Sequence, residues 1–251
     1  MNRFLNEPNL PKSRVKCVIT ANEDKSLINA LNELGISVIP IDKSPDLEPY
    51  IANHTDAGVY YLGNGQFFAD KCRKSLIDRL IKEKADVKAL NGICSPYPND
   101  CLLNCADIGD FVICNSDCAY KGIIDFAKAQ NKTILHTKQG YAKCSVCIVK
   151  RNTIITDDAS IYNACAKHRE ISALLIEKGS VLLKNMNYGF IGGCTGLINK
   201  DLLFFNGELT SHSNADLIID FLKSHNVSYV DIKNKPLTDI GSVIPIKEEV
   251  L

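Results

Sequence analysis

The sequence lacks an excess of charge of either sign. Its 251 residues include 29 Lys and Arg against 29 Asp and Glu, so the formal net charge is zero. A general nucleic-acid-binding protein carries an excess of basic residues, and this balance argues against nucleic acid as a partner. The remaining composition, with 45% hydrophobic and 23% charged residues, is typical of a globular protein.

Long apolar runs are also missing. No stretch approaches the roughly 20 apolar residues that a membrane-spanning helix needs, which argues against a membrane protein. The start, Met1–Lys12, is polar, contains two prolines and lacks the apolar centre of a signal peptide. We therefore expect a cytoplasmic protein.

Neither a linker nor a phosphate-binding loop interrupts the chain. The patterns G-x-x-x-x-G-K and G-x-G-x-x-G are both absent, and we expect no cofactor. Because 251 residues are near the upper size of a single core, we expect one domain over 1–251, with 1–14 as a peripheral N-terminal segment.

Cysteine, in contrast, is abundant. Eleven cysteines are an odd number in a chain that is large for a disulfide scaffold, so most are expected to be buried as small apolar side chains. Five of them stand close together, with gaps of 7, 4, 9 and 4 residues: Cys94, Cys101, Cys105, Cys114 and Cys118. Zinc and iron–sulfur sites usually show paired C-x₂-C spacings, so a metal site here is a hypothesis without support from the spacing.

A short phrase recurs five times along the chain. Each copy places an Asp or a Cys just before small residues that lead into an apolar run. The markers are separated by 51, 37, 50 and 45 residues and are Asp56, Asp107, Cys144, Cys194 and Asp239. A repeat of this length corresponds to one supersecondary unit.

The segments between the markers predict the same elements in each unit. Three markers lead into hairpins, of which the clearest turns at Asn64-Gly65. Helices are expected at 24–34, 70–84, 120–130, 160–169 and 214–225, the first opened by a capping box from Thr20 to Glu23 and the last capped by Ser213. A β-prone run follows each helix, at 36–41, 86–90, 132–136, 172–176 and 227–232.

The unit is therefore strand, strand, helix, strand, and about five units fill the chain. The first helix has no marker before it and the last marker has no helix after it, which a circular arrangement explains. Val15–Ile19 would then pair with the final strand near Ser242–Ile246 and close the ring, removing exposed sheet edges. An open α/β sheet is the competing architecture, and the ring is favoured.

Five such units in a ring resemble the pentein fold, a five-fold pseudo-symmetric α/β propeller of the guanidino-group-modifying enzymes. That superfamily includes arginine deiminase, agmatine deiminase, the dimethylarginine hydrolases and the amidinotransferases. The phrases Gln139–Ser145 and Gly189–Gly193 resemble those of an uncharacterised bacterial domain family of that fold. The resemblance covers roughly residues 15–246.

The resemblance implies a Cys nucleophile in the last repeat, a His base in a middle repeat and carboxylates that hold the guanidinium group. The last repeat of this chain, 237–245, contains no Cys, and the middle repeat has Tyr141-Ala142-Lys143 where a His would be expected. The nucleophile and base of the superfamily therefore do not transfer at their usual positions.

The markers nevertheless predict a site. In a ring, Asp56, Asp107 and Asp239 would approach the axis and, with Lys143, bind a small polar ligand; alternatively, these carboxylates cap local backbone groups. Cys144 and Cys194 share the repeat position and are candidates for a displaced nucleophile. A thiol among carboxylates has a raised pKa, so this role needs Lys143 or a histidine nearby. His54 is the candidate acid or base, because Asp56 stands two residues on.

Two functions follow as hypotheses. The first is a hydrolase or transferase that binds a guanidino, amidine or amide ligand in a central funnel through a displaced Cys. The alternative is a non-catalytic interaction module, like the ribosome anti-association factor that resembles this fold, which would have a protein partner. A homo-oligomer is also open.

Overall fold

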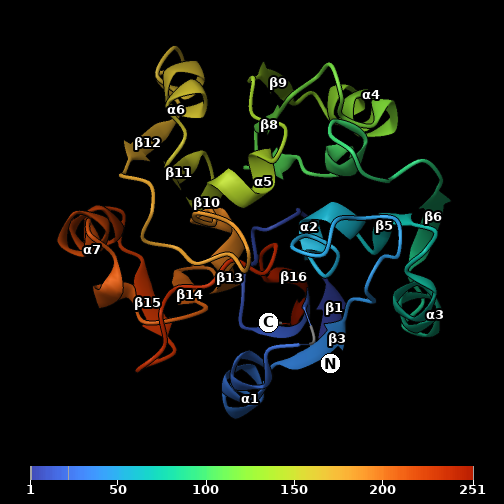
Figure 1. Ribbon diagram of the computed structural model, residues 1–251, viewed down its shortest axis with the longest axis horizontal. Coiled ribbons are helices and arrows are strands. Elements are labelled where there is room, and N and C mark those ends of the chain that lie inside the picture. The colour runs from blue at the N-terminus through green and yellow to red at the C-terminus, as the bar shows by residue number, and fades with distance from the viewer. Residues whose placement is uncertain (1, 22, 251) are drawn as a thin grey trace.

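The computed structural model describes residues 2–21 and 23–250 and shows five small sheets arranged around a centre (Figure 1). Within each sheet an inner strand pairs antiparallel with a middle strand, and the middle strand pairs parallel with an outer strand. The chain is thus a five-fold pseudo-symmetric α/β propeller, as the repeated phrase predicts.

The strands fall into three sets by their distance from the ring centre. The inner strands are β4 (Val59–Gly63), β7 (Ala106–Asp107), β10 (Val146–Lys150), β13 (Thr195–Asn199) and β16 (Ile244–Glu249). The middle strands are β2 (Val15–Thr20), β5 (Gln66–Asp70), β8 (Phe111–Cys114), β11 (Thr153–Thr156) and β14 (Leu202–Phe205). The outer strands are β3 (Ser37–Pro40), β6 (Asp86–Leu90), β9 (Thr133–His136), β12 (Ser172–Leu175) and β15 (Ser228–Asp231).

Each middle strand is joined to its outer strand through a helix, which the sequence predicts in all five units. These helices are α1 (Lys25–Glu33), α3 (Lys74–Lys82), α4 (Lys121–Ala129), α6 (Ala159–Cys165) and α7 (Ala215–Ser224). Their starts differ in detail from the prediction. Asp24, rather than a Thr20–Glu23 box, caps α1 by accepting hydrogen bonds from Ser26 and Leu27, and α7 begins after Asn214 rather than Ser213. The longest of these helices, α7, has 10 residues, so none of the described helices could span a bilayer.

The two ends of the chain together form one of the five units. β16 pairs antiparallel with β2, so that Ile244 lies opposite Ile19, as the ring hypothesis predicts. With β1 (Asn2–Phe4) at its edge, the strand order of this sheet is β1-β16-β2-β3, and the other four sheets have three strands each. The sheets stay separate ladders and each keeps an outer edge strand, so the ring shortens the exposed edges rather than removing all of them.

The N-terminal segment does not lie apart from the ring, although the sequence places it at the periphery. β1 (Asn2–Phe4) extends the first sheet, and Leu5 is fully buried. Further along, the Asn9 side chain donates to the backbone carbonyl of Asp107 at 3.1 Å. Apolar residues at positions 5 and 10 have neighbouring cores to enter, which is the physical reason that this segment packs inward.

Four apolar clusters lie between neighbouring units and hold the ring together. Eight of the eleven cysteines are buried and all are free thiols, in agreement with the expectation that they pack as small apolar groups. With the sheets fixed in this way, the segment before each inner strand faces the ring centre.

Candidate active site

The phrase that marks each repeat forms a single helical turn in three of the five units. α2 (Thr55–Gly58) precedes β4, α5 (Ala142–Ser145) precedes β10, and Gly192–Cys194 forms a comparable turn before β13. The small residues of the phrase are needed for close packing. A Cβ atom on Gly58 would lie 2.7 Å from Arg73 Nε and from Ile41 Cδ1. The turns α2 and α5 both lie near the ring centre (Figure 1).

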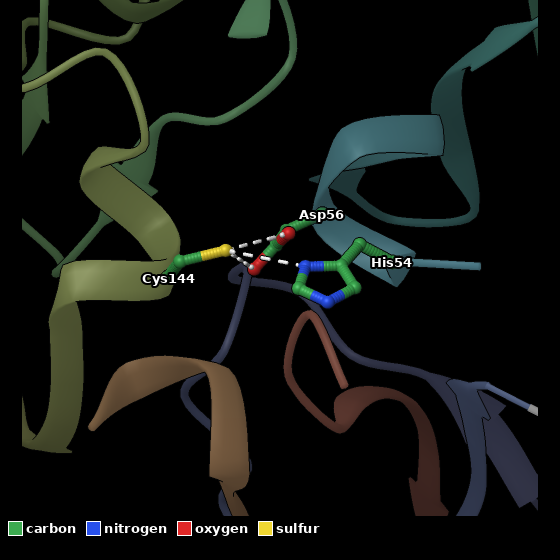
Figure 2. A group of neighbouring side chains, drawn as sticks. All are labelled: His54, Asp56 and Cys144. Carbon is green, nitrogen blue, oxygen red and sulfur yellow. Dashed lines mark hydrogen bonds between the residues drawn. The ribbon is translucent and has the colours of Figure 1, made fainter. Parts of the chain in front are cut away.

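Cys144, Asp56 and His54 meet at this centre (Figure 2). The Cys144 Sγ atom lies 3.0 Å from both carboxylate oxygens of Asp56 and 3.9 Å from His54 Nδ1. His54 and Asp56 come from the start of α2, whereas Cys144 comes from α5. All three side chains are buried, so a thiol, a carboxylate and an imidazole share one water-poor site.

Asn104 joins these groups, although the sequence did not single it out. Its amide nitrogen donates to Asp56 Oδ1 at 3.0 Å and to Cys144 Sγ at 3.4 Å. Its carbonyl oxygen accepts from the backbone N–H groups of Lys143 and Cys144 at 2.7 and 3.1 Å. Asn104 thereby fixes α5 relative to α2. Its position in the sequence could have indicated this role, because Asn104 and Cys144 each stand two residues before an inner strand, β7 and β10 respectively.

Lys143 supplies a counter-charge to Asp56, and the Ser242 hydroxyl lies between the two groups. The Lys143 Nζ atom donates to Ser242 Oγ at 2.9 Å, and Ser242 Oγ lies 2.9 Å from Asp56 Oδ2. Both side chains are buried. Lys143 was a candidate for contact with a ligand, but its ammonium group lies behind Asp56, on the side away from the cavity described below.

Asp239 forms the third part of the site. Its two carboxylate oxygens accept hydrogen bonds from the backbone N–H groups of Phe190 and Gly241 at 2.9 and 3.0 Å, and Oδ1 lies 3.8 Å from His54 Nδ1. Burial raises the pKa of Asp239 to about 6, against the lowering effect of those two hydrogen bonds. The carboxyl group can therefore change its ionisation close to neutral pH.

Burial also determines the ionisation of the other three groups. It raises the pKa of the Cys144 thiol well above its ordinary value, an effect that the neighbouring Asp56 and Asp239 reinforce. Burial lowers the pKa of His54 and raises the pKa of Asp56, with opposing effects from their mutual attraction. The empty site therefore favours a neutral thiol and a neutral imidazole, and a change in local charge is needed to form a thiolate.

A cavity of about 280 Å³ opens over these groups. Its floor includes His54, Cys144 and Asp239, and its walls are largely aromatic and aliphatic. The chain between β12 and β13 supplies one wall through Leu183, Met186, Asn187, Tyr188 and Phe190. The site is thus a small concave pocket with its polar groups collected at one end, which is the usual form of a small-molecule site.

Of the five markers, Cys144 and Asp239 line this cavity, Asp56 lies against Cys144, and Asp107 and Cys194 lie outside the cavity. Asp107 pairs with Lys132 Nζ at 2.5 Å and accepts from the N–H of Gly109, so it holds a local turn and a salt bridge instead of facing the cavity. The register of β7 explains its position, because Asp107 is within the strand and Asn104 occupies the central place. Cys194 is fully buried, and its thiol donates to the carbonyl of Ile191 at 3.1 Å.

In the part of the chain that the structure describes, no three of the cysteines from Cys94 to Cys118 have their sulfur atoms within 4.8 Å of one another. The sulfur atoms of Cys101 and Cys118 lie 3.1 Å apart, whereas Cys105 pairs with Cys114. Among the described residues, the group with three possible metal-ligand atoms within 4.8 Å of one another is His54, Asp56 and Cys144. Asn104 already donates N–H groups to two of these atoms, which favours hydrogen bonding over metal ligation.

Residues 18–244 match the model of a protein family described as "Family of unknown function (DUF6873)". The chain belongs to this family. A search of curated proteins gives no significant match for it. The match covers the five units from β2 to the start of β16, so the propeller is the part that the family shares.

Solved structures with the same fold come from guanidino-modifying enzymes. The saxitoxin-pathway amidinotransferase SxtG from Microseira wollei has a TM-score of 0.61 and 8% sequence identity, with 98% of each chain covered. The inosamine-phosphate amidinotransferase StrB1 from Streptomyces griseus has a TM-score of 0.60 and 11% identity, covering 99% of this chain and 98% of its own. Agmatine deiminase from C. jejuni, solved with substrate bound, has a TM-score of 0.58 and 12% identity, covering 100% and 98%. The chain therefore has the pentein fold that the repeat and its phrases predict.

Proposed function

We propose that this protein binds a small guanidinium or amidinium cation in the cavity and that Cys144 attacks its central carbon. The observation that carries the proposal is the position of Cys144 Sγ, at the cavity floor between the Asp56 carboxylate and the His54 imidazole. A thiol, a base and carboxylates around one point are the groups that this chemistry requires.

Charge explains how a buried thiol with a raised pKa could react. Asp56 and Asp239 raise the pKa of Cys144 in the empty site. A planar cation bound between the carboxylates would offset their charge and add a positive charge beside the sulfur. Both effects lower the pKa of the thiol, so the substrate itself would promote thiolate formation. The nucleophile would then be active only with a ligand in place.

The reaction can be written with its protons balanced. The Cys144 proton passes to His54 Nδ1, the sulfur forms a bond to the guanidinium or amidinium carbon, and the bond from that carbon to the leaving nitrogen breaks. The leaving amine or ammonia takes the proton from His54. Water in a hydrolase, or an acceptor amine in a transferase, then attacks the covalent adduct and gives a proton to His54. The carbon–sulfur bond breaks, and His54 returns that proton to the sulfur.

The pseudo-symmetry of the ring supports a nucleophile from an unusual repeat. The resemblance places the superfamily's Cys in the last unit, where this chain has Asp239 and Ser242. Because equivalent turns from several units point to the same centre, a Cys in the middle repeat can reach the reacting carbon as well. Cys194 has the same repeat position but lies outside the cavity, which supports Cys144 as the nucleophile.

A cationic alkylating agent tests the assignment. The protein would be incubated with 2-chloroacetamidine and digested, and the modified cysteines would be identified by mass spectrometry. We expect Cys144 to be the main modified buried cysteine, with the same result in a Cys194→Ala variant and loss of this adduct in Cys144→Ser. Modification confined to partly exposed cysteines such as Cys94 would contradict the proposal and favour a non-catalytic interaction module.

The same residues allow a test of the metal alternative. If His54, Asp56 and Cys144 held a divalent ion, a chelator would increase the alkylation of Cys144 and elemental analysis would find the metal at one equivalent. Under the proposal, alkylation is insensitive to chelator.

We further propose that the protein works in the cytoplasm as one domain. Free thiols throughout the described chain fit a reducing compartment. The pairing of β2 with β16 links the two ends of the chain, and it supports a fold that acts as one unit.

A further inference from the structure

The cavity is chemically divided into a polar floor and an apolar wall. His54, Cys144 and Asp239 form the floor, together with the charge of Asp56 just behind Cys144. The walls include four aromatic side chains and a methionine, namely Tyr50, Tyr141, Tyr188, Phe190 and Met186. A ligand that fits this arrangement has a cationic head and an apolar body.

The described wall of the cavity contains no lysine or arginine. Lys143 is directed at Ser242, on the far side of Asp56, where it lines a separate space of about 10 Å³. Lys178, which contacts one wall residue, lies 5.8 Å from the ring centroid of Tyr188 and 3.9 Å from Asp158 Oδ2, so its charge is offset by Asp158.

A carboxylate on the ligand would therefore lose its water without gaining a partner. The transfer of an ionised carboxylate into an apolar site is strongly unfavourable unless a cation or several N–H groups receive it. An alkyl or aryl group, in contrast, gains from contact with the aromatic walls. The volume limits its size, because about 280 Å³ is just below the range of roughly 300–1,000 Å³ that is usual for small-molecule pockets.

Building on the proposed function, we infer that the cavity selects guanidinium and amidinium cations with a short, uncharged apolar body and rejects those that carry a carboxylate. Simple alkyl- or arylguanidines and amidines belong to the selected class, and guanidino acids belong to the rejected one. The selectivity comes from two features: the polar floor binds the cation, and the described walls have no Lys or Arg to bind a carboxylate.

Matched ligand pairs test this inference. Benzamidine would be compared with 4-amidinobenzoate, and butylguanidinium with 4-guanidinobutanoate, by titration calorimetry on Cys144→Ser so that no adduct forms. We expect the carboxylated member of each pair to bind at least 100-fold more weakly. Thermal-shift measurements on the unsubstituted protein give a second readout that does not depend on the variant.

Two variants separate the wall from the floor. Asn187→Arg places a cation on the described wall and is expected to reduce the discrimination against carboxylates by about tenfold, since a charge pair then forms. Lys178→Ala removes a lysine that contacts Tyr188 without lining the cavity, and is expected to leave the ratio unchanged.

The results distinguish this inference from the proposed function. Equal or tighter binding of the carboxylated ligands would overturn the selectivity and leave the cation site in place. Failure of every guanidinium and amidinium ligand to bind the folded protein would overturn the proposed function and the selectivity with it.

Discussion

The Cys144 sulfur lies 3.0 Å from each carboxylate oxygen of Asp56, although 88 residues separate them in the sequence. The contact exists because the short helices α2 and α5, from two different units, both lie at the ring centre. It places an oxygen pair directly against a thiol, which stabilises the protonated sulfur and disfavours the thiolate. The chemistry of the site therefore depends on a ligand that changes this balance.

The binding of a cation should depend on pH through Asp239. Its pKa is raised to about 6, and only the ionised form attracts a cation. We therefore expect the affinity of Cys144→Ser for benzamidine to rise by roughly tenfold between about pH 5 and about pH 7, as a single group with this pKa requires. Titration calorimetry at several pH values measures this. Asp107→Asn is the matched control, because Asp107 lies outside the cavity, and its profile should be unchanged. A flat profile in both proteins would contradict the role of Asp239.

Asn104 can be tested by changing its donor and its acceptor separately. Asn104→Asp keeps an oxygen for the N–H groups of Lys143 and Cys144 but replaces the amide donor beside Asp56 and Cys144. The added negative charge should raise the pKa of the thiol further, so alkylation of Cys144 by a neutral reagent should need a pH higher by about one unit or more.

Asn104→Ala instead leaves two buried N–H groups without their acceptor. We expect it to lower the free energy of unfolding by about 1–3 kcal/mol for each of them. Denaturant unfolding of both variants would check this, and an unchanged pH–rate profile in Asn104→Asp would show that Asn104 does not influence the thiol.

Gly241 packs against His54, and Gly92, which has no close neighbour, serves as its control. Gly241 has φ +73°, and a Cβ atom there would lie 2.5 Å from His54 Cβ. Gly92 has φ +85° with nothing within 4 Å of the added atom. Both Gly→Ala variants incur the cost of a left-handed backbone, about 1–2 kcal/mol, but only Gly241→Ala should also displace His54 and reduce the alkylation of Cys144. Equal losses of stability and unchanged alkylation would contradict this.

Two adjacent aspartates should have opposite effects on stability as pH changes. Burial raises the pKa of Asp157 to about 7, whereas the pKa of Asp158 is lowered, despite burial, by its hydrogen bonds to Ser160 and Ile161. Asp157 contributes to the free energy of unfolding through its raised pKa. This contribution is fully present below about pH 4, the ordinary pKa of an Asp in the unfolded chain, and is lost as pH rises through about 7. The contribution of Asp158 is present above about pH 4 and is lost as pH falls through its lowered pKa.

Asp157→Asn should therefore increase the free energy of unfolding by roughly 1–3 kcal/mol at about pH 8, with little gain at about pH 4. Asp158→Ala should decrease it by about 0.5–2 kcal/mol at about pH 8, because the helix loses its N-cap. Denaturant titrations at the two pH values measure both changes. A gain from Asp157→Asn that is equal at both pH values would point to packing instead of charge.

The fold could be predicted from the sequence because each unit carries local signals. The turn at Asn64-Gly65 and the apolar faces of helices such as 74–82 are properties of short segments. The pairing of Val15–Ile19 with the final strand followed from the count of units, and it is confirmed by Ile244 lying opposite Ile19. The packing of residues 2–14 into the ring was not predicted, since their burial depends on neighbours far away in the sequence.

Only part of the site could be predicted from the sequence. His54, Asp56, Cys144 and Asp239 share a recognisable phrase, and they do come together. Asn104 and Ser242 were missed because their partners lie 39 or more residues away in the chain. Asp107 was predicted to lie at the ring centre with the other markers, and this was wrong for a related reason. Asn104, three residues earlier in the chain, occupies that place instead. The phrase alone does not show which residue starts β7.

The central claim is that a bound cation activates Cys144, and the relative rate of two alkylating agents tests it most directly. The second-order rate constants for modification of Cys144 by cationic 2-chloroacetamidine and by neutral 2-chloroacetamide would be measured at neutral pH. The same ratio for the partly exposed Cys94 would serve as the internal reference. We predict that the ratio at Cys144 exceeds that at Cys94 by at least about 100-fold, or about 2.7 kcal/mol. Equal ratios at the two cysteines would contradict the account.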